Sequence, residues 1–193
     1  VEDGTTFEEN ALIKASEIAK IAHEMPEYKD MIKAAYDKGH TIGMHTYSHD
    51  YAKVYASVDA YFQDLDQIGQ MVQEEIGYVP CFIRFPGGSS NTVSKKYTAG
   101  IMSTLVQEVQ NRGYQYYDWN GSSGDGSVRT TEELVAQATS FDSNNIILLC
   151  HDSHGKQTTV EALPQIIEHY QSLGYTFKAL DRDSFVAHHG VNN

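Results

Sequence analysis

The chain has 193 residues, of which 40% are hydrophobic and 21% are charged, as in one packed globular domain rather than a disordered or low-complexity chain. Its 26 acidic and 14 basic residues give a formal net charge of -12, the wrong sign for binding nucleic acid or anionic lipid. No apolar run approaches the roughly 18 residues of a membrane span, and the first ten residues lack a basic, apolar leader. We therefore expect neither a membrane span nor a signal peptide in the chain as given.

Helix and strand patterns alternate along the chain. Helical spacing of apolar residues and capping residues predict helices at about 5–22, 26–38, 57–76, 101–112, 131–138 and 158–173. Thr158 and Glu161 have the spacing of a capping box at the start of the last helix. Short apolar runs predict strands at 41–45, 81–85, 114–119, 146–150 and 175–179. This alternation favours an α/β fold with a parallel sheet or a β/α barrel.

Neither a linker nor a repeat divides the chain. The sequence therefore predicts one domain over residues 1–180 and a C-terminal tail over residues 181–193. Cys81 and Cys150 each lie in an apolar run, so we expect two reduced core residues rather than a disulfide.

Polar residues follow the predicted strands, at the carboxyl ends where parallel α/β folds bind ligands. His45 and His49 follow the first strand, and on a helical turn residues four apart can reach one metal ion. The alternative is a pair of surface histidines beside a helix start. The adjacent glutamate of the His-Glu-x-x-His zinc proteases is absent from this pair.

Two further strand ends carry candidate catalytic groups. The Pro86-Gly87-Gly88 loop can expose backbone N–H groups as an oxyanion site does, or it is an ordinary strand-to-helix turn. Arg84 needs a carboxylate nearby if it is buried. Asp125 and His151 can pair, because a carboxylate beside an imidazole orients the ring and raises its pKa, as a general acid near neutrality requires.

Four segments together resemble the polysaccharide deacetylases, carbohydrate esterase family 4, over about residues 39–180. They are His45-Thr46-Tyr47-Ser48-His49, Arg84-Phe85-Pro86-Gly87-Gly88, the stretch from Trp119 to Asp125, and Leu149-Cys150-His151-Asp152. The resemblance implies a distorted β/α barrel and a divalent metal, usually zinc, held by two histidines and one aspartate.

Carried over by residue, the resemblance assigns roles to the candidate groups. His45 and His49 correspond to the two metal histidines, and His151 to the general acid that Asp125 tunes. Arg84 corresponds to the arginine that holds the catalytic base. The implied substrate contacts are the backbone after Pro86 at Gly87, the acetyl pocket at Leu149, and the groove residue Trp119.

The chain departs from the family pattern in three places. Gly87 stands where many members have tyrosine, and Gly126 where many have tryptophan, which leaves the floor and wall of the sugar groove undefined. Members begin with a strand ending in an Asp-Asp motif that supplies the base and the third metal ligand. Asp3 in Glu2-Asp3-Gly4 imitates this motif, but only one residue precedes it. We therefore interpret the barrel as lacking its first two strands in this chain, with base and third ligand unassigned.

These observations favour a metal-dependent hydrolase that removes N-acetyl or O-acetyl groups from a polysaccharide such as peptidoglycan or a chitin-like glycan. The alternative is an inactive, carbohydrate-binding or structural member of the same fold. A weaker possibility is another metal-dependent hydrolase, for which His154 is the spare histidine beside a motif. His188 and His189 are expected to be exposed residues rather than ligands, and the alternative is a tail that folds back over the barrel. No motif in the sequence assigns the polysaccharide substrate or the oligomeric state. The resemblance favours an extracellular or cell-surface location.

Overall fold

The computed structural model describes residues 29–153 and 155–193. The helix predicted at 5–22, together with Asp3 and His154, lies outside the described residues.

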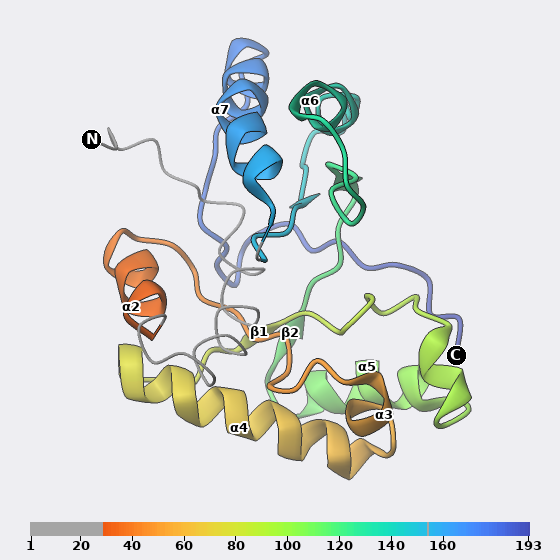
Figure 1. Cartoon of the computed structure of the whole chain (residues 1–193). Coiled ribbons are helices and arrows are strands. Elements are labelled where there is room, and N and C mark those ends of the chain that lie inside the picture. The colour runs from red at the N-terminus through yellow and green to blue at the C-terminus, as the bar shows by residue number, and fades with distance from the viewer. Residues whose placement is uncertain (1–28, 154) are drawn as a thin grey trace.

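The described chain alternates helices with short parallel strands (Figure 1), which confirms the predicted α/β class. Its elements are α2 (Lys29–Asp37), α3 (Tyr51–Val54), α4 (Val58–Ile76), β1 (Phe82–Ile83), the 3-10 helix η2 (Val93–Lys96), α5 (Ile101–Asn111), β2 (Gln115–Tyr116), β3 (Gly121–Ser122), α6 (Thr131–Ala138), β4 (Leu148–Leu149) and α7 (Gln157–Ser172).

The strands form two separate parallel pairs. In the first, Phe82 of β1 pairs with Gln115 of β2, and Met44 joins as a single parallel bridge to Ile83. In the second, Gly121 of β3 pairs with Leu148 of β4. Within residues 29–153 and 155–193 the pairs do not close into a barrel, so closure stays a prediction.

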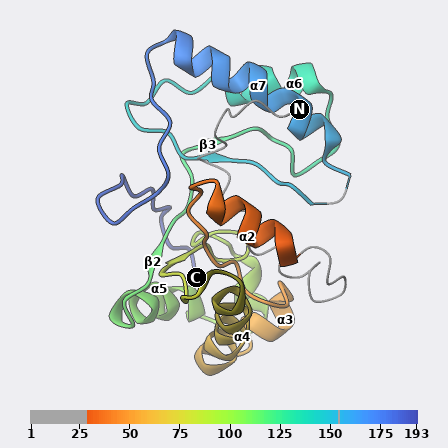
Figure 2. The same ribbon diagram turned by 90° about the vertical axis from the view of Figure 1, so that its left-hand side faces the viewer.

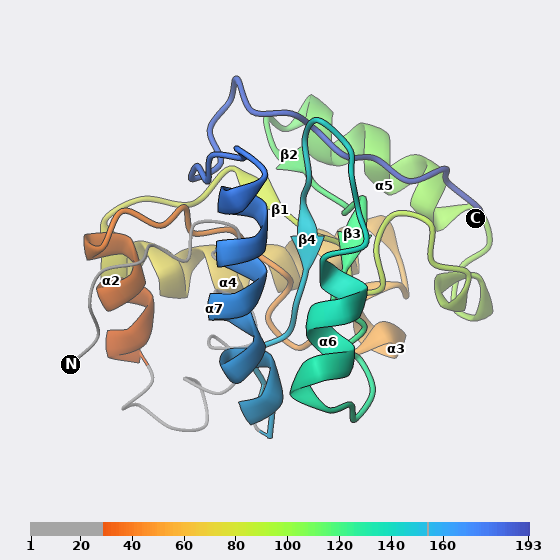
Figure 3. The same cartoon turned by 90° about the horizontal axis from the view of Figure 1, so that it is seen from above.

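The helices cover the strands in two groups (Figure 1). Helices α4 and α5 lie on one side of β1 and β2, whereas α6 and α7 lie together on the other side of the molecule. Figure 2 shows α2 between these groups, and Figure 3 shows α6 and α7 running beside β3 and β4. None of the described helices is long and apolar enough to cross a membrane.

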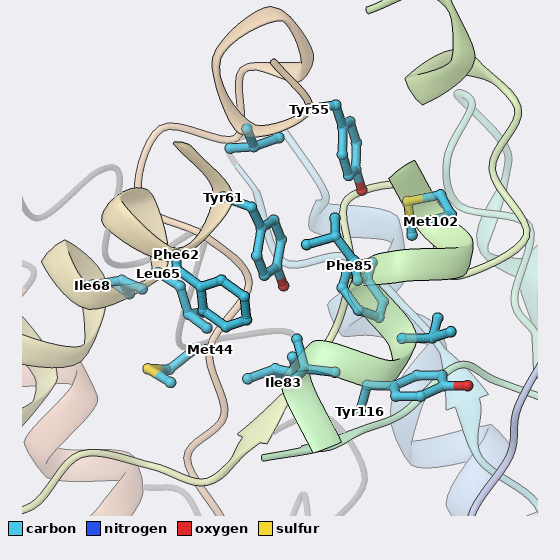
Figure 4. Close-up of a cluster of buried hydrophobic side chains, with 14 of the residues drawn as sticks. Met44, Tyr55, Tyr61, Phe62, Leu65, Ile68, Ile83, Phe85, Met102 and Tyr116 are labelled. Atoms are coloured by element: carbon cyan, nitrogen blue, oxygen red, sulfur yellow. The ribbon is translucent and has the colours of Figure 1, made fainter. Parts of the chain in front are cut away.

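The largest core lies between α4, β1 and α5, and local sequence signals fix its longest helix. Ser57 caps α4 by accepting a hydrogen bond from the backbone N–H of Ala60 at 3.0 Å, and Gly77 ends it at a φ of 86°. Figure 4 shows side chains of α4 pointing toward Ile83 and Phe85. Burial of this face holds α4 against the first strand pair.

The predicted strands are mostly longer than the observed ones. The strand predicted at 41–45 reduces to the Met44 bridge, because Thr46 turns to a left-handed φ of 70° and ends the extended run. Strands predicted at 81–85, 114–119 and 146–150 shrink to two residues each. The prediction also missed β3, which has a Gly-Ser sequence of low strand propensity and exists through its pairing with β4.

Two predictions near α7 are wrong. Residues 175–179 form no strand, since their backbone finds no partner strand among the described residues; the Tyr175 N–H instead bonds the Tyr170 carbonyl at 3.0 Å. The Thr158 capping box is also absent, because α7 begins one residue earlier and its N-cap is Lys156. Glu161 instead accepts a hydrogen bond from Thr131 on α6 at 3.1 Å.

The segment after residue 186 packs along the first strand pair. The Asp118 N–H donates to the Ala187 carbonyl at 2.8 Å, and the His188 ring stacks on Tyr116 at a centroid distance of 3.8 Å. His188 is exposed, as expected, whereas His189 is half-buried, which corrects the expectation for that residue; the tail folds back along the strands, as in the alternative. Both cysteines are free, as expected; Cys150 is buried and Cys81 half-buried.

Candidate active site

The two histidines predicted to bind metal lie side by side beyond the Met44 bridge. The centroids of the His45 and His49 rings are 4.9 Å apart. The Nδ1–H of His45 donates to the Arg84 carbonyl at 2.7 Å, which leaves Nε2 with its lone pair available. Burial, and then the neighbouring His49, lower the pKa of His45 to about 3, so the ring is a neutral imidazole suited to a metal.

The loop between these histidines has an unusual backbone. Thr46 has a φ of 70° and His49 a φ of 48°, and both lie in the left-handed region that favours glycine. Such residues cost roughly 1–3 kcal/mol each and persist where the surrounding structure holds them. Here the buried Asp64 of α4 accepts the backbone N–H groups of Tyr47 at 2.5 Å and Ser48 at 3.2 Å.

Arg84 lies beneath the histidines and is 2% exposed. Burial lowers its pKa to about 10, while the negative charge of Asp118 opposes that shift. Its Nε donates to the Tyr117 carbonyl at 3.4 Å, and neither terminal nitrogen finds a partner among the described residues. The predicted carboxylate partner within ion-pair distance is therefore absent from residues 29–153 and 155–193.

The loop after Arg84 is held in place by tyrosines. The Tyr55 hydroxyl donates to the Pro86 carbonyl at 2.7 Å. Gly87 has a φ of 75°, and a Cβ at this position would lie 2.6 Å from the Tyr51 hydroxyl. The left-handed φ therefore favours glycine here, and a larger residue would also require the Tyr51 side chain to move.

Asp125 and His151 pair as predicted. The Nδ1–H of His151 donates to Asp125 at 2.8 Å, and the His151 backbone N–H donates to the other carboxylate oxygen at 2.6 Å. Burial raises the pKa of Asp125, but these hydrogen bonds outweigh it and hold that pKa below its ordinary value of 3.8. The carboxylate thus fixes the ring and leaves Nε2 free to handle a proton.

Two residues of the α7 start support this pair, and neither was predicted. The Thr159 hydroxyl, 3% exposed, donates to Asp125 at 3.0 Å. The Lys156 ammonium donates to the Asp125 carbonyl. The sequence offered only a weak signal, a threonine on the apolar side of the predicted helix.

The remaining predicted substrate residues lie around these groups. Leu149 is half-buried on β4, two residues before His151. Trp119 is half-exposed, with the Arg84 guanidinium 5.7 Å from its ring centroid. The His189 ring meets Trp119 edge to face at 4.6 Å and contacts the Trp119 carbonyl at 2.6 Å. The C-terminal segment thus helps to fix Trp119, a contact that no sequence signal indicated.

The donor set can be tested for a metal ion. Two adjacent imidazoles, one oriented by a backbone carbonyl, suit a divalent transition metal. Within the described part of the chain, no group of three histidine, cysteine or acidic side chains is placed to hold one. His45 and His49 therefore fit as two ligands, and a third ligand is not assigned.

The fold and site together have the arrangement of a hydrolase-type centre, with two adjacent histidines and a third histidine oriented by a carboxylate. His151 lies close enough to His45 that its charge adds, after burial and His49, to the lowering of the His45 pKa, so the two groups lie near one another. The polysaccharide deacetylase family profile matches residues 16–117, and the chain belongs to this family.

Individual relatives agree with this membership. The catalytic domain of peptidoglycan N-acetylglucosamine deacetylase from Eubacterium rectale ATCC 33656 is 39% identical, with a TM-score of 0.83 over 91% of this chain and 86% of that one. The putative polysaccharide deacetylase YheN of Bacillus subtilis (strain 168) is 25% identical over 88% of this chain and 58% of its own length. A chitin deacetylase of Arthroderma benhamiae is 32% identical over 72% of this chain and 35% of its own. The chain thus spans little more than half, or less, of these curated relatives.

Proposed function

We propose that the chain is a metal-dependent de-N-acetylase of a polysaccharide, in which His151 is the general acid. The hydrogen bond between Asp125 and His151, beside the His45–His49 pair, is the observation that carries this proposal. Zinc is the proposed metal, and a distorted β/α barrel over residues 1–180 the proposed architecture. The names of the relatives favour an N-acetylglucosamine polymer, peptidoglycan or chitin, and thus action at the cell surface or outside the cell.

Different residues of the chain would have different roles in the hydrolysis of the acetamide. His45 and His49 would hold the metal, which when bound polarises a carbonyl and lowers the pKa of water. The backbone N–H of Gly87, directly after Pro86, would donate to the acetyl oxygen where negative charge develops, since the N–H groups of Gly88 and Ser89 already donate to the Phe85 carbonyl and to Asp118. Leu149 would contact the acetyl methyl group, and Trp119 the sugar.

His151 then completes bond cleavage. Water adds its oxygen to the acetyl carbon and loses a proton to the base carboxylate. Nε2 of the protonated His151 then gives a proton to the sugar nitrogen as the C–N bond breaks, which releases acetate and a free amine. Asp125 keeps the proton on Nδ1 and stabilises the positive ring before that transfer. Neither terminal nitrogen of the buried Arg84 has a hydrogen-bond partner among the described residues, and we propose that these two nitrogens hold the base carboxylate of the reaction.

Acetate release from N-acetylglucosamine oligomers tests the proposal. The chain is assayed with added zinc or cobalt, after removal of metal with a chelator, and after metal is restored. We expect release that depends on the metal and is recovered with it. Release that persists without metal contradicts metal dependence. Oligomer binding without acetate release favours the alternative of an inactive, carbohydrate-binding member.

A further inference from the structure

We propose that Asp64 is the positioning residue that sets His49 relative to His45. The inference rests on the proposed role of the two histidines as metal ligands. Asp64 lies on α4, 15 residues after His49 in the sequence, and its carboxylate reaches back to the loop that joins the two rings.

The buried carboxylate of Asp64 bonds to the backbone of the histidine loop between His45 and His49. The side chain is 7% exposed, and no lysine or arginine of the described chain forms an ion pair with it. Its hydrogen bonds come from the backbone N–H groups of Tyr47 and Ser48. The Ser48 backbone nitrogen lies 3.2 Å from each of the two carboxylate oxygens. A buried carboxylate is costly unless such donors replace its water, so the loop and Asp64 depend on each other.

The two histidines are not held in the same way. The His45 ring is fixed by the backbone of the first strand pair, since Nδ1 donates to the Arg84 carbonyl and Arg84 N–H bonds Met44 at 2.9 Å. His49 follows the loop, whose path requires left-handed conformations at Thr46 and at His49 itself, and its ring meets the Tyr51 ring edge to face at 5.9 Å. Asp64 anchors Tyr47 and Ser48, which lie between these two positions. It therefore fixes where the His49 imidazole lies.

The carboxylate is chemically suited to this task. It is an acceptor at both oxygens, so it can take two backbone N–H groups at once. In Asp64→Asn the shape is retained, but one acceptor becomes an NH2 donor that faces the loop N–H groups. We expect the loop to shift and the second ligand with it.

Metal affinity is the direct test. The zinc dissociation constant of the full chain is measured by competition with a chromophoric chelator, and the cobalt absorption spectrum reports ligand geometry. We expect Asp64→Asn to weaken zinc binding about 10- to 100-fold, the range for residues that orient metal ligands, and to change the cobalt spectrum. The matched control is Asp66→Asn, an exposed aspartate on the same helix, which should bind zinc as the parent does.

The outcomes separate this inference from the proposed function. If His49→Ala binds zinc as tightly as the parent, the metal site itself is wrong. If His49→Ala loses affinity but folded Asp64→Asn keeps both parent affinity and parent spectrum, the positioning role is wrong. Native circular dichroism of each variant excludes a general loss of folding as the cause.

A measurement on the parent covers the case in which Asp64→Asn does not fold. Energetic coupling between two sites is reciprocal. If metal binding requires the histidine loop to be held by Asp64, bound metal must in turn stabilise that loop. We expect zinc to slow hydrogen exchange at the Tyr47 and Ser48 amides, with little change in α6. Exchange at those two amides that zinc leaves unchanged overturns the inference.

Discussion

The two halves of the site are built differently. On one side, His45 and His49 lie on a loop with two left-handed residues, tied to α4 by one buried carboxylate. On the other side, Asp125 receives hydrogen bonds from the His151 ring, the His151 backbone and Thr159, all from elements around the β3–β4 pair. The pair proposed to supply the acid is complete within the described chain, whereas the pair proposed to bind metal depends on a distant helix and on a ligand still unassigned. We call these pairs, with the residues that hold them, the acid half and the metal half.

This difference separates two ways of positioning a reactive group. A carboxylate that accepts several hydrogen bonds fixes its partner through local bonds alone. A strained loop holds its geometry only while its surroundings oppose relaxation. We therefore expect substitutions in the acid half to act mainly on catalysis, and substitutions around the histidine loop to act on metal binding.

The largest expected effect comes from His151→Ala. Loss of the general acid should lower the rate of acetate release by about 10²- to 10⁴-fold. Zinc affinity should stay close to that of the parent, because His151 is not placed among the metal ligands. His169→Ala, near the end of α7, serves as control. Parent-like turnover in His151→Ala contradicts its role as the acid.

Asp125→Asn should have the next largest effect on turnover. The amide cannot accept from both His151 donors as the carboxylate does, so the ring loses its fixed orientation and the charge that stabilises its protonated form. We expect a fall in acetate release of about 10²-fold, at the lower end of what general acid catalysis contributes, with zinc affinity little changed. If Asp125→Asn instead loses zinc affinity but keeps the parent rate of acetate release per bound metal, Asp125 supports metal binding and not the acid, which contradicts the prediction.

The lowered pKa of Asp125 predicts that its contribution to the stability of the folded chain depends on pH. The pKa of Asp125 is lower in the folded chain than its ordinary value of 3.8, so the unfolded chain binds this proton first as pH falls. Its stabilising contribution is therefore full above about pH 4 and lost as pH falls through the folded pKa. Urea unfolding of the parent and Asp125→Asn should show a gap at pH 6 that narrows toward pH 3. A gap of constant size contradicts the assignment.

Thr159→Val tests the support of Asp125 with a smaller change. The substitution keeps the shape and removes one hydrogen bond to a buried carboxylate, which is worth about 1.5 kcal/mol of unfolding free energy. Urea denaturation measures the loss, with the exposed Thr104 of α5 changed to Val as control. No loss of stability in Thr159→Val indicates that the other two donors suffice.

The smallest effect is expected from Thr46→Gly in the histidine loop. Glycine relieves the left-handed strain but adds chain entropy and removes a buried side chain, so the terms largely cancel. The unfolding free energy should stay within about 1 kcal/mol of the parent. A loss of several kcal/mol shows that side-chain packing, not backbone strain, dominates at this position.

Much of the fold could be predicted from local sequence. Ser57 and Gly77 mark the two ends of α4, and the helix predicted at 131–138 begins and ends where α6 does. These signals act within a few residues, through caps and apolar spacing. By contrast, β3 and the missing strand at 175–179 were decided by whether a partner strand lies alongside, which no local pattern records.

The sequence by itself determined the pairs His45–His49 and Asp125–His151, because each candidate sits just after an apolar strand pattern and the chemistry limits the residue types. Only the tertiary structure decided what holds these pairs, namely Asp64 from α4 and Thr159 from α7, and what holds Trp119, namely His189 of the C-terminal segment. These residues are distant in the chain from the groups they hold and carry no motif. Hydrogen bonds across such separations exist only once packing has brought the helices and the C-terminal segment onto the strands.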